Sequence, residues 1–145
     1  IILNNNSIKE DKFTSLVNHN SNIKIVQDAM FSSTNEIRGT SYRSRIDDPK
    51  YQFAGKTGTA QVKKITKRDR ELDLETSEIP YEERDHAIYI AFGPFKNPRY
   101  AVSILVEHGG SGSSVAAPLA KILFKKIIDR HEIRKNFELN KYLNI

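Results

Sequence analysis

The sequence has no cysteine among its 145 residues. Disulfide bonds, zinc sites with thiolate ligands and thiol chemistry are therefore excluded. The chain also has no signal peptide and no apolar run long enough to span a membrane, and it starts with Ile1-Ile2-Leu3 instead of a methionine. These absences predict a soluble piece that was excised or processed from a longer protein and equals one domain or part of one.

Positive charge is in slight excess, but it is not concentrated in one place. The 23 lysines and arginines exceed the 18 acidic residues, which gives a formal net charge of +5. Basic residues are scattered among acidic ones, and the pattern of a nucleic-acid-binding module is missing. His19, His108 and His131 do not have the spacing of metal ligands. We expect a solvated surface of mixed charge, no nucleic-acid partner, no metal site and no cofactor.

Hydrophobic periodicity predicts an α+β fold with a short antiparallel sheet and a helix for each face. Apolar residues at helical spacing predict a helix over 23–37, and strand patterns occur around Lys56 and over 86–92 and 100–106. Both faces of the 86–92 segment are largely apolar, which predicts a central strand. A last helix is expected from about 115 to 130, with a buried stripe made of Leu119, Ile122, Leu123 and Ile127.

Three segments are expected to lie outside this core. Residues 1–22 are polar and rich in asparagine, which predicts an irregular lead-in. Residues 63–85 are dense in charge and predict a long exposed loop. Residues 131–145 read as a polar tail with isolated apolar positions.

The most informative segment is Lys56-Thr57-Gly58-Thr59, which is followed by a continuing strand pattern. Lys56 supplies a compact positive charge, and the two threonines each supply a hydroxyl. Gly58 removes a side chain where a ligand could approach the backbone. This combination indicates a site for an anion, either a carboxylate or a developing oxyanion.

Nucleotide binding is the competing interpretation of the same residues, because Gly55-Lys56-Thr57 matches the end of a P-loop. A P-loop needs another glycine five residues before Gly55, and that position is Lys50. It also needs a helix directly after the Lys-Thr pair, whereas the strand pattern continues here. The glycines at 109, 110 and 112 precede the last predicted helix but lack a dinucleotide-binding fingerprint, so they predict a turn.

Residues further along the chain point to one family. They are Arg84-Asp85-His86-Ala87, Ala91-Phe92-Gly93-Pro94, Val106-Glu107-His108-Gly109-Gly110 and Val115-Ala116-Ala117-Pro118. Penicillin-binding proteins and serine β-lactamases share a Lys-Thr-Gly motif, and with it this order resembles the C-terminal half of the transpeptidase domain of class B penicillin-binding proteins. The elongation-type penicillin-binding protein 2 group is most similar. The resemblance places this half-domain at 23–130 and implies a partial penicillin-binding protein/serine β-lactamase-like fold.

The resemblance implies a role for each residue of the Lys-Thr-Gly-Thr strand. Lys56 would be catalytic, placing positive charge beside a serine nucleophile and helping to relay protons. Thr57 and Thr59 would bind the carboxylate of a D-Ala-D-Ala stem peptide or of a β-lactam, and the Thr59 N–H would form half of the oxyanion hole. Gly58 would let the acyl chain lie against the strand. The parent would be a peptidoglycan D,D-transpeptidase, anchored in the bacterial inner membrane with this domain in the periplasm.

The nucleophile itself is expected to be missing from this chain. The family carries it in a Ser-x-x-Lys motif far upstream of the Lys-Thr-Gly, with a Ser-x-Asn between them. Ser21-Asn22-Ile23-Lys24 and Ser33-Thr34-Asn35 match these letters but lie too close to Lys56, so we interpret both as accidental. The chain alone is therefore expected to be inactive. The resemblance also implies that the strand at 100–106 has lost a neighbour, which leaves an edge for a second copy or the tail to cover.

Two other interpretations stay open. The chain could be the matching part of a serine β-lactamase or of a penicillin-sensing receptor, although the residues around Asp85 and Glu107 argue against both. It could instead be a noncatalytic interaction module that uses the charged 63–85 loop for partner contacts. His86 stands next to Asp85 as a base held by a carboxylate would, but a structural pair at the start of a strand is favoured.

Overall fold

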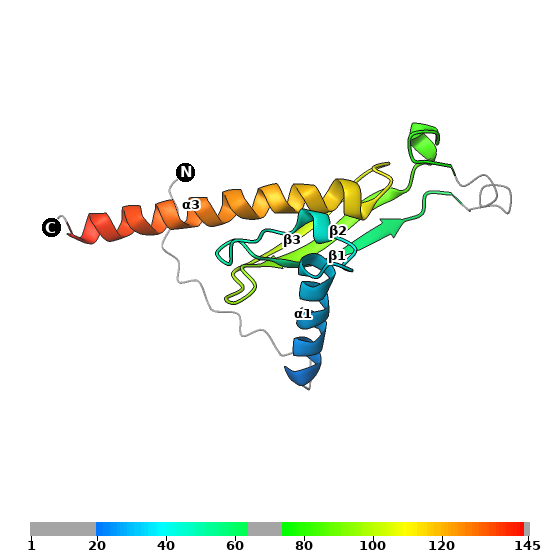
Figure 1. Ribbon diagram of the computed structural model, residues 1–145. Coiled ribbons are helices and arrows are strands. Elements are labelled where there is room, and N and C mark those ends of the chain that lie inside the picture. Colours follow the sequence, from blue (N-terminus) through cyan, green and yellow to red (C-terminus); the bar gives the residue numbers. More distant parts are fainter. Residues whose placement is uncertain (1–19, 64–73, 144–145) are drawn as a thin grey trace, which may run out of the picture.

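The computed structural model describes residues 20–63 and 74–143 of the chain (Figure 1). These residues form two α-helices and a three-stranded antiparallel sheet, which confirms the predicted α+β class. The elements are α1 (Asn20–Asn35), a 3-10 turn (Tyr42–Ser44), β1 (Ala54–Ala60), a second 3-10 turn (Tyr81–Glu83), β2 (His86–Gly93), β3 (Tyr100–Val106), a π-helical turn (Gly112–Ala116) and α3 (Ala117–Leu143). Most of the predicted lead-in at 1–22 and the middle of the predicted loop at 63–85 lie outside the described residues.

Strand β2 is the central strand of the sheet, as its two apolar faces predict. On one side β1 pairs with it so that Lys56 lies opposite Ile90 and Thr57 opposite Tyr89. On the other side β3 places Ile104 opposite Tyr89. Because directly paired residues share a face of the sheet, Thr57, Tyr89 and Ile104 lie on one face. Lys56 and Ile90 lie on the other.

The hydrophobic core fills the space between the Tyr89 face of the sheet and α3. Ala117 and Ala120 are fully buried, and their small side chains let the helix approach the strands closely. The ring of Phe124 stacks on Phe53 with centroids 4.9 Å apart, and Phe53 meets Tyr89 edge-on at 6.4 Å. Each of these rings is fully buried, and burial of a large apolar side chain contributes roughly 1.5–3 kcal/mol.

The buried stripe predicted for the last helix is wrong. Leu119 is 45% exposed and Ile122 is 53% exposed, while the helix buries a different set: Ala117, Ala120, Phe124 and Ile128. The prediction gave weight to the largest apolar side chains. Close packing of the helix on the sheet instead selects the face where the alanines allow the shortest approach.

Helix α3 also continues through the segment that was predicted as a polar tail. It runs to Leu143 and extends beyond the sheet (Figure 1). Near its middle, Asp129 accepts a hydrogen bond from the Tyr51 hydroxyl, and the Tyr100 hydroxyl lies 2.6 Å from Nδ1 of His131. The bond from Tyr51, aided by Lys50, lowers the pKa of the Asp129 carboxyl. These contacts join α3 to the loop before β1 and to the start of β3. Residues 131–143 belong to this helix, and within the described residues they add no strand to the outer edge of β3.

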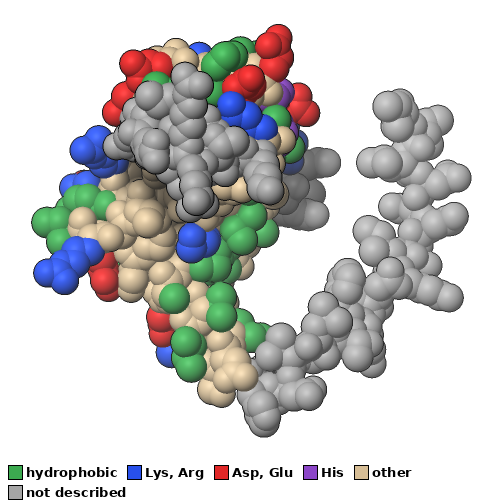
Figure 2. Space-filling view, turned by 90° about the vertical axis from the view of Figure 1, so that its right-hand side faces the viewer, with side chains coloured by type: hydrophobic (Ala, Val, Ile, Leu, Met, Phe, Trp, Pro, Cys, Tyr) green, Lys and Arg blue, Asp and Glu red, His purple; other side chains and the backbone are tan. Residues whose placement is uncertain are grey.

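Helix α1 lies on the other side of the sheet from α3 and projects away from it (Figure 1). Its C-terminal end packs against β1, whereas Ile25 is 66% exposed and Val26 58% exposed nearer its start. Hydrophobic side chains gather along this projection in the space-filling view (Figure 2). The helix therefore covers its face of the sheet only in part and leaves apolar surface beside β1.

Candidate anion-binding site at strand β1

Strand β1 forms one edge of the sheet and carries the Lys-Thr-Gly-Thr sequence. Ala54 and Gly55 at its start are buried, Thr57 is half-buried, and Lys56 and Thr59 are exposed. The Lys56 ammonium donates a hydrogen bond of 2.8 Å to the Thr57 carbonyl oxygen, and its other N–H groups remain available to a ligand. Lys56 lies on one face of this edge strand and Thr57 and Thr59 lie on the other. A cation and two hydroxyls therefore flank the same edge, where they could hold an anion.

At two positions near this edge, neighbouring atoms come so close to the backbone that only glycine fits. A Cβ atom on Gly55 would lie 2.3 Å from the Tyr89 hydroxyl oxygen, because the tyrosine ring passes directly beneath the strand there. A Cβ atom on Gly112 would lie 2.5 Å from the carbonyl oxygens of Gly58 and Ile88. The turn predicted from the glycines at 109–112 is confirmed. At Gly112 its backbone packs directly on the backbone of Gly58 in β1 and Ile88 in β2.

Beneath β1 lies a buried cluster of hydroxyl groups. The Tyr89 hydroxyl is 2.9 Å from Oγ1 of Thr34 and 3.0 Å from Oγ of Ser41, and all three residues are fully or almost fully buried. Oγ1 of Thr34 also accepts a 3.0 Å hydrogen bond from the Gly55 N–H. Burial raises the pKa of the Tyr89 phenol, while its hydrogen bonds with Ser41 and Thr34 oppose that shift. Thr34 thus joins the end of α1 to Tyr89 on β2 and to Gly55 on β1.

A second line of hydroxyl groups runs along the surface above this cluster. Oγ of Ser33 lies 3.1 Å from Oγ1 of Thr40, which lies 3.2 Å from Oγ1 of Thr57. The line starts on the last turn of α1, crosses the loop after it and ends on β1. Thr57 is therefore already in contact with a hydroxyl partner on its exposed side.

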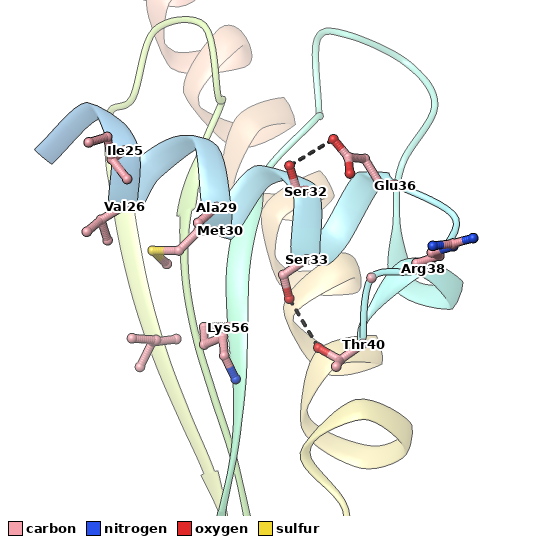
Figure 3. A pocket seen from close by; sticks show the side chains of 12 residues that line it. Ile25, Val26, Ala29, Met30, Ser32, Ser33, Glu36, Arg38, Thr40 and Lys56 are labelled. Carbon is pink, nitrogen blue, oxygen red and sulfur yellow. Dashed lines mark hydrogen bonds between the residues drawn. The ribbon is translucent and has the colours of Figure 1, made fainter. Parts of the chain in front are cut away.

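An open pocket of about 620 Å³ lies between α1 and the Lys56 face of the sheet (Figure 3). One wall is apolar and includes Val26, Met30 and Ile90, and the other end is polar and includes Ser33, Thr40 and Lys56. The full lining is Ile25, Val26, Ala29, Met30, Ser32, Ser33, Glu36, Arg38, Gly39, Thr40, Lys56 and Ile90. Figure 3 shows Lys56 on the strand beside the Ser33–Thr40 pair. This is the form of a half-open ligand cleft, with a few polar groups at one end of an apolar surface.

Asp85 and His86 have structural roles at the far end of β1. Nδ1 of His86 accepts a 2.9 Å hydrogen bond from the His108 N–H, and an Asp85 carboxylate oxygen accepts one of 3.2 Å from the Val62 N–H. The two side chains fix two different loops instead of holding each other. This agrees with the structural interpretation, although the predicted pairing between them is not observed.

The two short letter matches for a nucleophile do not assemble a site. Ser21 lies in the first turn of α1, twelve residues before Ser33, which corresponds to about 18 Å along a helix axis. Lys24 is 3.8 Å from Asp28 on the same helix. In the other match, the Asn35 amide donates to the carbonyls of Phe31 and Phe53 and serves the packing of α1 on the sheet.

Sequence reasoning missed Thr40, Ser33 and Tyr89 as neighbours of the Lys-Thr-Gly-Thr strand. Thr40 lies 17 residues before Thr57, in a loop whose path no periodicity reveals. Only the register of β1 on β2 and the end of α1 bring these hydroxyls together. The glycine at 39 is the one available signal, since it marks the turn that brings Thr40 back to α1.

Two absences hold for the part of the chain that the structure describes. Within it, no three His, Cys, Asp or Glu side chains gather where they could share a metal ion. Its helices are also all too short or too polar to cross a membrane.

Comparison with known proteins identifies the family to which the chain is similar. The family model "Penicillin binding protein transpeptidase domain" matches residues 2–129. The peptidoglycan D,D-transpeptidase MrdA of Salmonella typhimurium is 34% identical over 105 residues, covering 72% of this chain and 16% of the relative. MrdA of Haemophilus influenzae is 34% identical over 113 residues, covering 78% of this chain and 16% of the relative.

Solved structures show the same similarity. The penicillin-binding protein PBP2 of Helicobacter pylori, in its complex with MreC, superposes with a TM-score of 0.60 at 32% identity, over 75% of this chain and 17% of that one. PBP2 of Pseudomonas aeruginosa, in complex with WCK 5153, gives a TM-score of 0.56 at 33% identity, over 75% of this chain and 20% of that one. The chain therefore spans about a sixth to a fifth of these relatives, and its resemblance to the penicillin-binding protein 2 group is confirmed.

Proposed function

Because the chain belongs to the family of penicillin-binding protein transpeptidase domains, we propose that β1 is the anion-binding wall of a serine acyl-transfer site. The observation that carries this proposal is the exposed edge formed by Lys56 and Thr59, with the half-open pocket beside Lys56. The reaction is D,D-transpeptidation of peptidoglycan stem peptides, and a β-lactam would occupy the same place. The names of the relatives support this substrate class.

Each residue of the strand has a task in that reaction. A serine hydroxyl attacks the carbonyl between the two D-alanines, its proton passes to the leaving amine, and D-alanine departs from an acyl-enzyme. The amine of a second stem peptide then attacks the ester and releases the serine. Lys56 stabilises negative charge and assists the proton transfers, while the Thr59 N–H binds the oxyanion. Thr57 and Thr59 bind the terminal carboxylate, and Gly58 gives the acyl chain room beside the backbone.

The nucleophile is proposed to come from outside this chain. Ser21 lies in the first turn of α1, outside the lining of the pocket beside Lys56, and the Ser33 hydroxyl contacts Thr40 in the line that leads to Thr57. The exposed apolar wall at Ile25 and Val26 is then explained as a packing surface. Another part of the longer protein would pack on it and bring the serine to the polar end of the pocket.

The cellular setting follows from the same proposal. The longer protein would be anchored in the bacterial inner membrane and would hold this domain in the periplasm, where peptidoglycan is cross-linked. The alternatives, part of a serine β-lactamase or penicillin-sensing receptor and a noncatalytic module, are less well supported, since the relatives reported above are named transpeptidases. The noncatalytic module differs from the others in one measurable way, because it would form no covalent adduct.

Intact-mass spectrometry after incubation with benzylpenicillin tests the proposal. The longer protein that contains this chain should gain the mass of one penicilloyl group, and peptide mapping should locate it on a serine outside residues 1–145. The isolated chain should gain no mass. An adduct on Ser21 would overturn the split-site proposal, and an unmodified longer protein would favour the noncatalytic module.

A further inference from the structure

The line of hydroxyl groups that ends at Thr57 has a direction once a carboxylate is bound. A threonine hydroxyl has one proton to donate and two lone pairs that can accept. If Thr57 gives its proton to the carboxylate, its contact with Thr40 at 3.2 Å can persist only with Thr40 as the donor. Thr40 then has no proton left for Ser33, 3.1 Å away, so Ser33 must donate to Thr40.

The direction Ser33 to Thr40 to Thr57 to carboxylate is therefore the single arrangement that keeps every contact. Each hydroxyl that accepts a hydrogen bond becomes a better donor for the next one, so the chain strengthens the bond to the ligand. It also favours the rotamer of Thr57 that keeps Oγ1 near Thr40, because a β-branched side chain has few alternatives.

Thr40 is held rigidly enough to act in this way. The residues on both sides of it are fixed against the last turn of α1: the Ser41 N–H and hydroxyl both bond the Ser33 carbonyl, at 3.0 and 3.1 Å. A Cβ atom on Gly39 would lie 2.3 Å from that same carbonyl oxygen, so the chain turns there at contact distance. The Thr40 side chain itself is exposed, so its hydroxyl can be removed without opening the core.

We propose that Thr40 is a positioning residue that orients the Thr57 hydroxyl toward the carboxylate of the stem peptide or β-lactam. This inference rests on the proposed function, because it requires a carboxylate at Thr57. It predicts that removing the Thr40 hydroxyl lowers the acylation rate only for a ligand that has a free carboxylate. A variant that failed to fold would instead lose the rate with every ligand.

The test compares acylation of the longer protein by benzylpenicillin and by its methyl ester, which lacks the carboxylate charge. Thr40→Val should lower the second-order rate constant with benzylpenicillin by about tenfold, the scale of a lost hydrogen bond next to a charged group, and leave the rate with the ester unchanged. Thr40→Ser should restore the benzylpenicillin rate. Ser77→Ala, which removes an exposed hydroxyl from the segment before β2, is the control and should have no effect.

A double variant completes the test. Thr40→Val should add no further loss when Thr57→Val is already present, since both act on one interaction. The positioning role is overturned if Thr40→Val slows acylation by benzylpenicillin and by its methyl ester equally. It is also overturned if the rate losses of Thr40→Val and Thr57→Val add fully in the double variant. Both results leave the proposed function intact. A wild-type protein that benzylpenicillin does not acylate overturns both.

Discussion

The two edges of the sheet are built differently. Strand β1 exposes Lys56 and Thr59, and its buried end is joined to α1 through the Gly55 N–H and Thr34. Strand β3 exposes Ala101, Ser103 and Leu105, and within the described residues no strand pairs with its outer side. Leu105 alone is 57% exposed.

Under the proposed function, β1 is the edge that serves a ligand and β3 is the edge that serves the rest of the fold. A lysine and a covering helix end are features that keep another strand from adding to an edge. β1 has both, which agrees with the proposal that a small molecule binds there. β3 has the apolar alternation of a strand inside a larger sheet, and the relatives are several times longer than this chain. We interpret its free edge as the place where the longer protein continues the sheet.

Gly55→Ala gives the largest expected change in stability, because Gly55 lies where β1 contacts Thr34 of α1 and Tyr89 of β2. The new Cβ atom would overlap the buried Tyr89 hydroxyl, at 2.3 Å. We expect the free energy of unfolding of the chain to fall by about 2–3 kcal/mol, the cost of overpacking a rigid core. Urea denaturation monitored by circular dichroism measures it.

Gly58→Ala is the matched control on the same strand. Its Cβ atom would lie 3.3 Å from Cβ of Ile88, which a small shift relieves, so the loss should stay below about 1 kcal/mol. Equal losses for the two variants would show that β1 is not locked to α1 at Gly55.

Leu105→Lys, at the opposite edge, is expected to weaken self-association of the chain, which is a smaller effect in free energy. The isolated chain should self-associate through β3, since this edge has exposed backbone groups and an apolar face. Two lysines brought together by pairing of two copies repel each other, so the substitution should weaken association by about tenfold. Sedimentation velocity over a range of concentrations measures this. Ile122→Lys, at an equally exposed apolar site on α3, should leave association unchanged. A wild-type chain that stays monomeric throughout contradicts the comparison.

The strands and the family could be predicted from the sequence because their signals are local. The alternation over 86–92 and 100–106 and the order of the short motifs need no knowledge of the fold. The buried face of α3 could not be predicted in this way. Its choice depends on how closely Ala117 and Ala120 approach the sheet, which is a property of packing and not of hydrophobicity.

The residues of the candidate site also fall into a local group that could be predicted and a distant group that could not. Lys56, Thr57, Gly58 and Thr59 are consecutive, so their common position could be predicted, although their roles stay proposals. Thr40 and Tyr89 reach the strand from distant parts of the chain through β-sheet register and the end of α1. These contacts cannot be predicted from a pattern in a single sequence, so only the folded structure reveals the line of hydroxyl groups.

The central claim is that the β1 edge works in acyl transfer, and the acylation rate of Lys56→Ala in the longer protein tests it most directly. Stopped-flow measurement with benzylpenicillin should show a rate constant about 100-fold or more below wild type, the usual scale for a group that assists proton transfer. Lys96→Ala, which removes an exposed lysine from the β2–β3 loop, should match wild type. A Lys56→Ala protein that acylates at the wild-type rate would contradict the account.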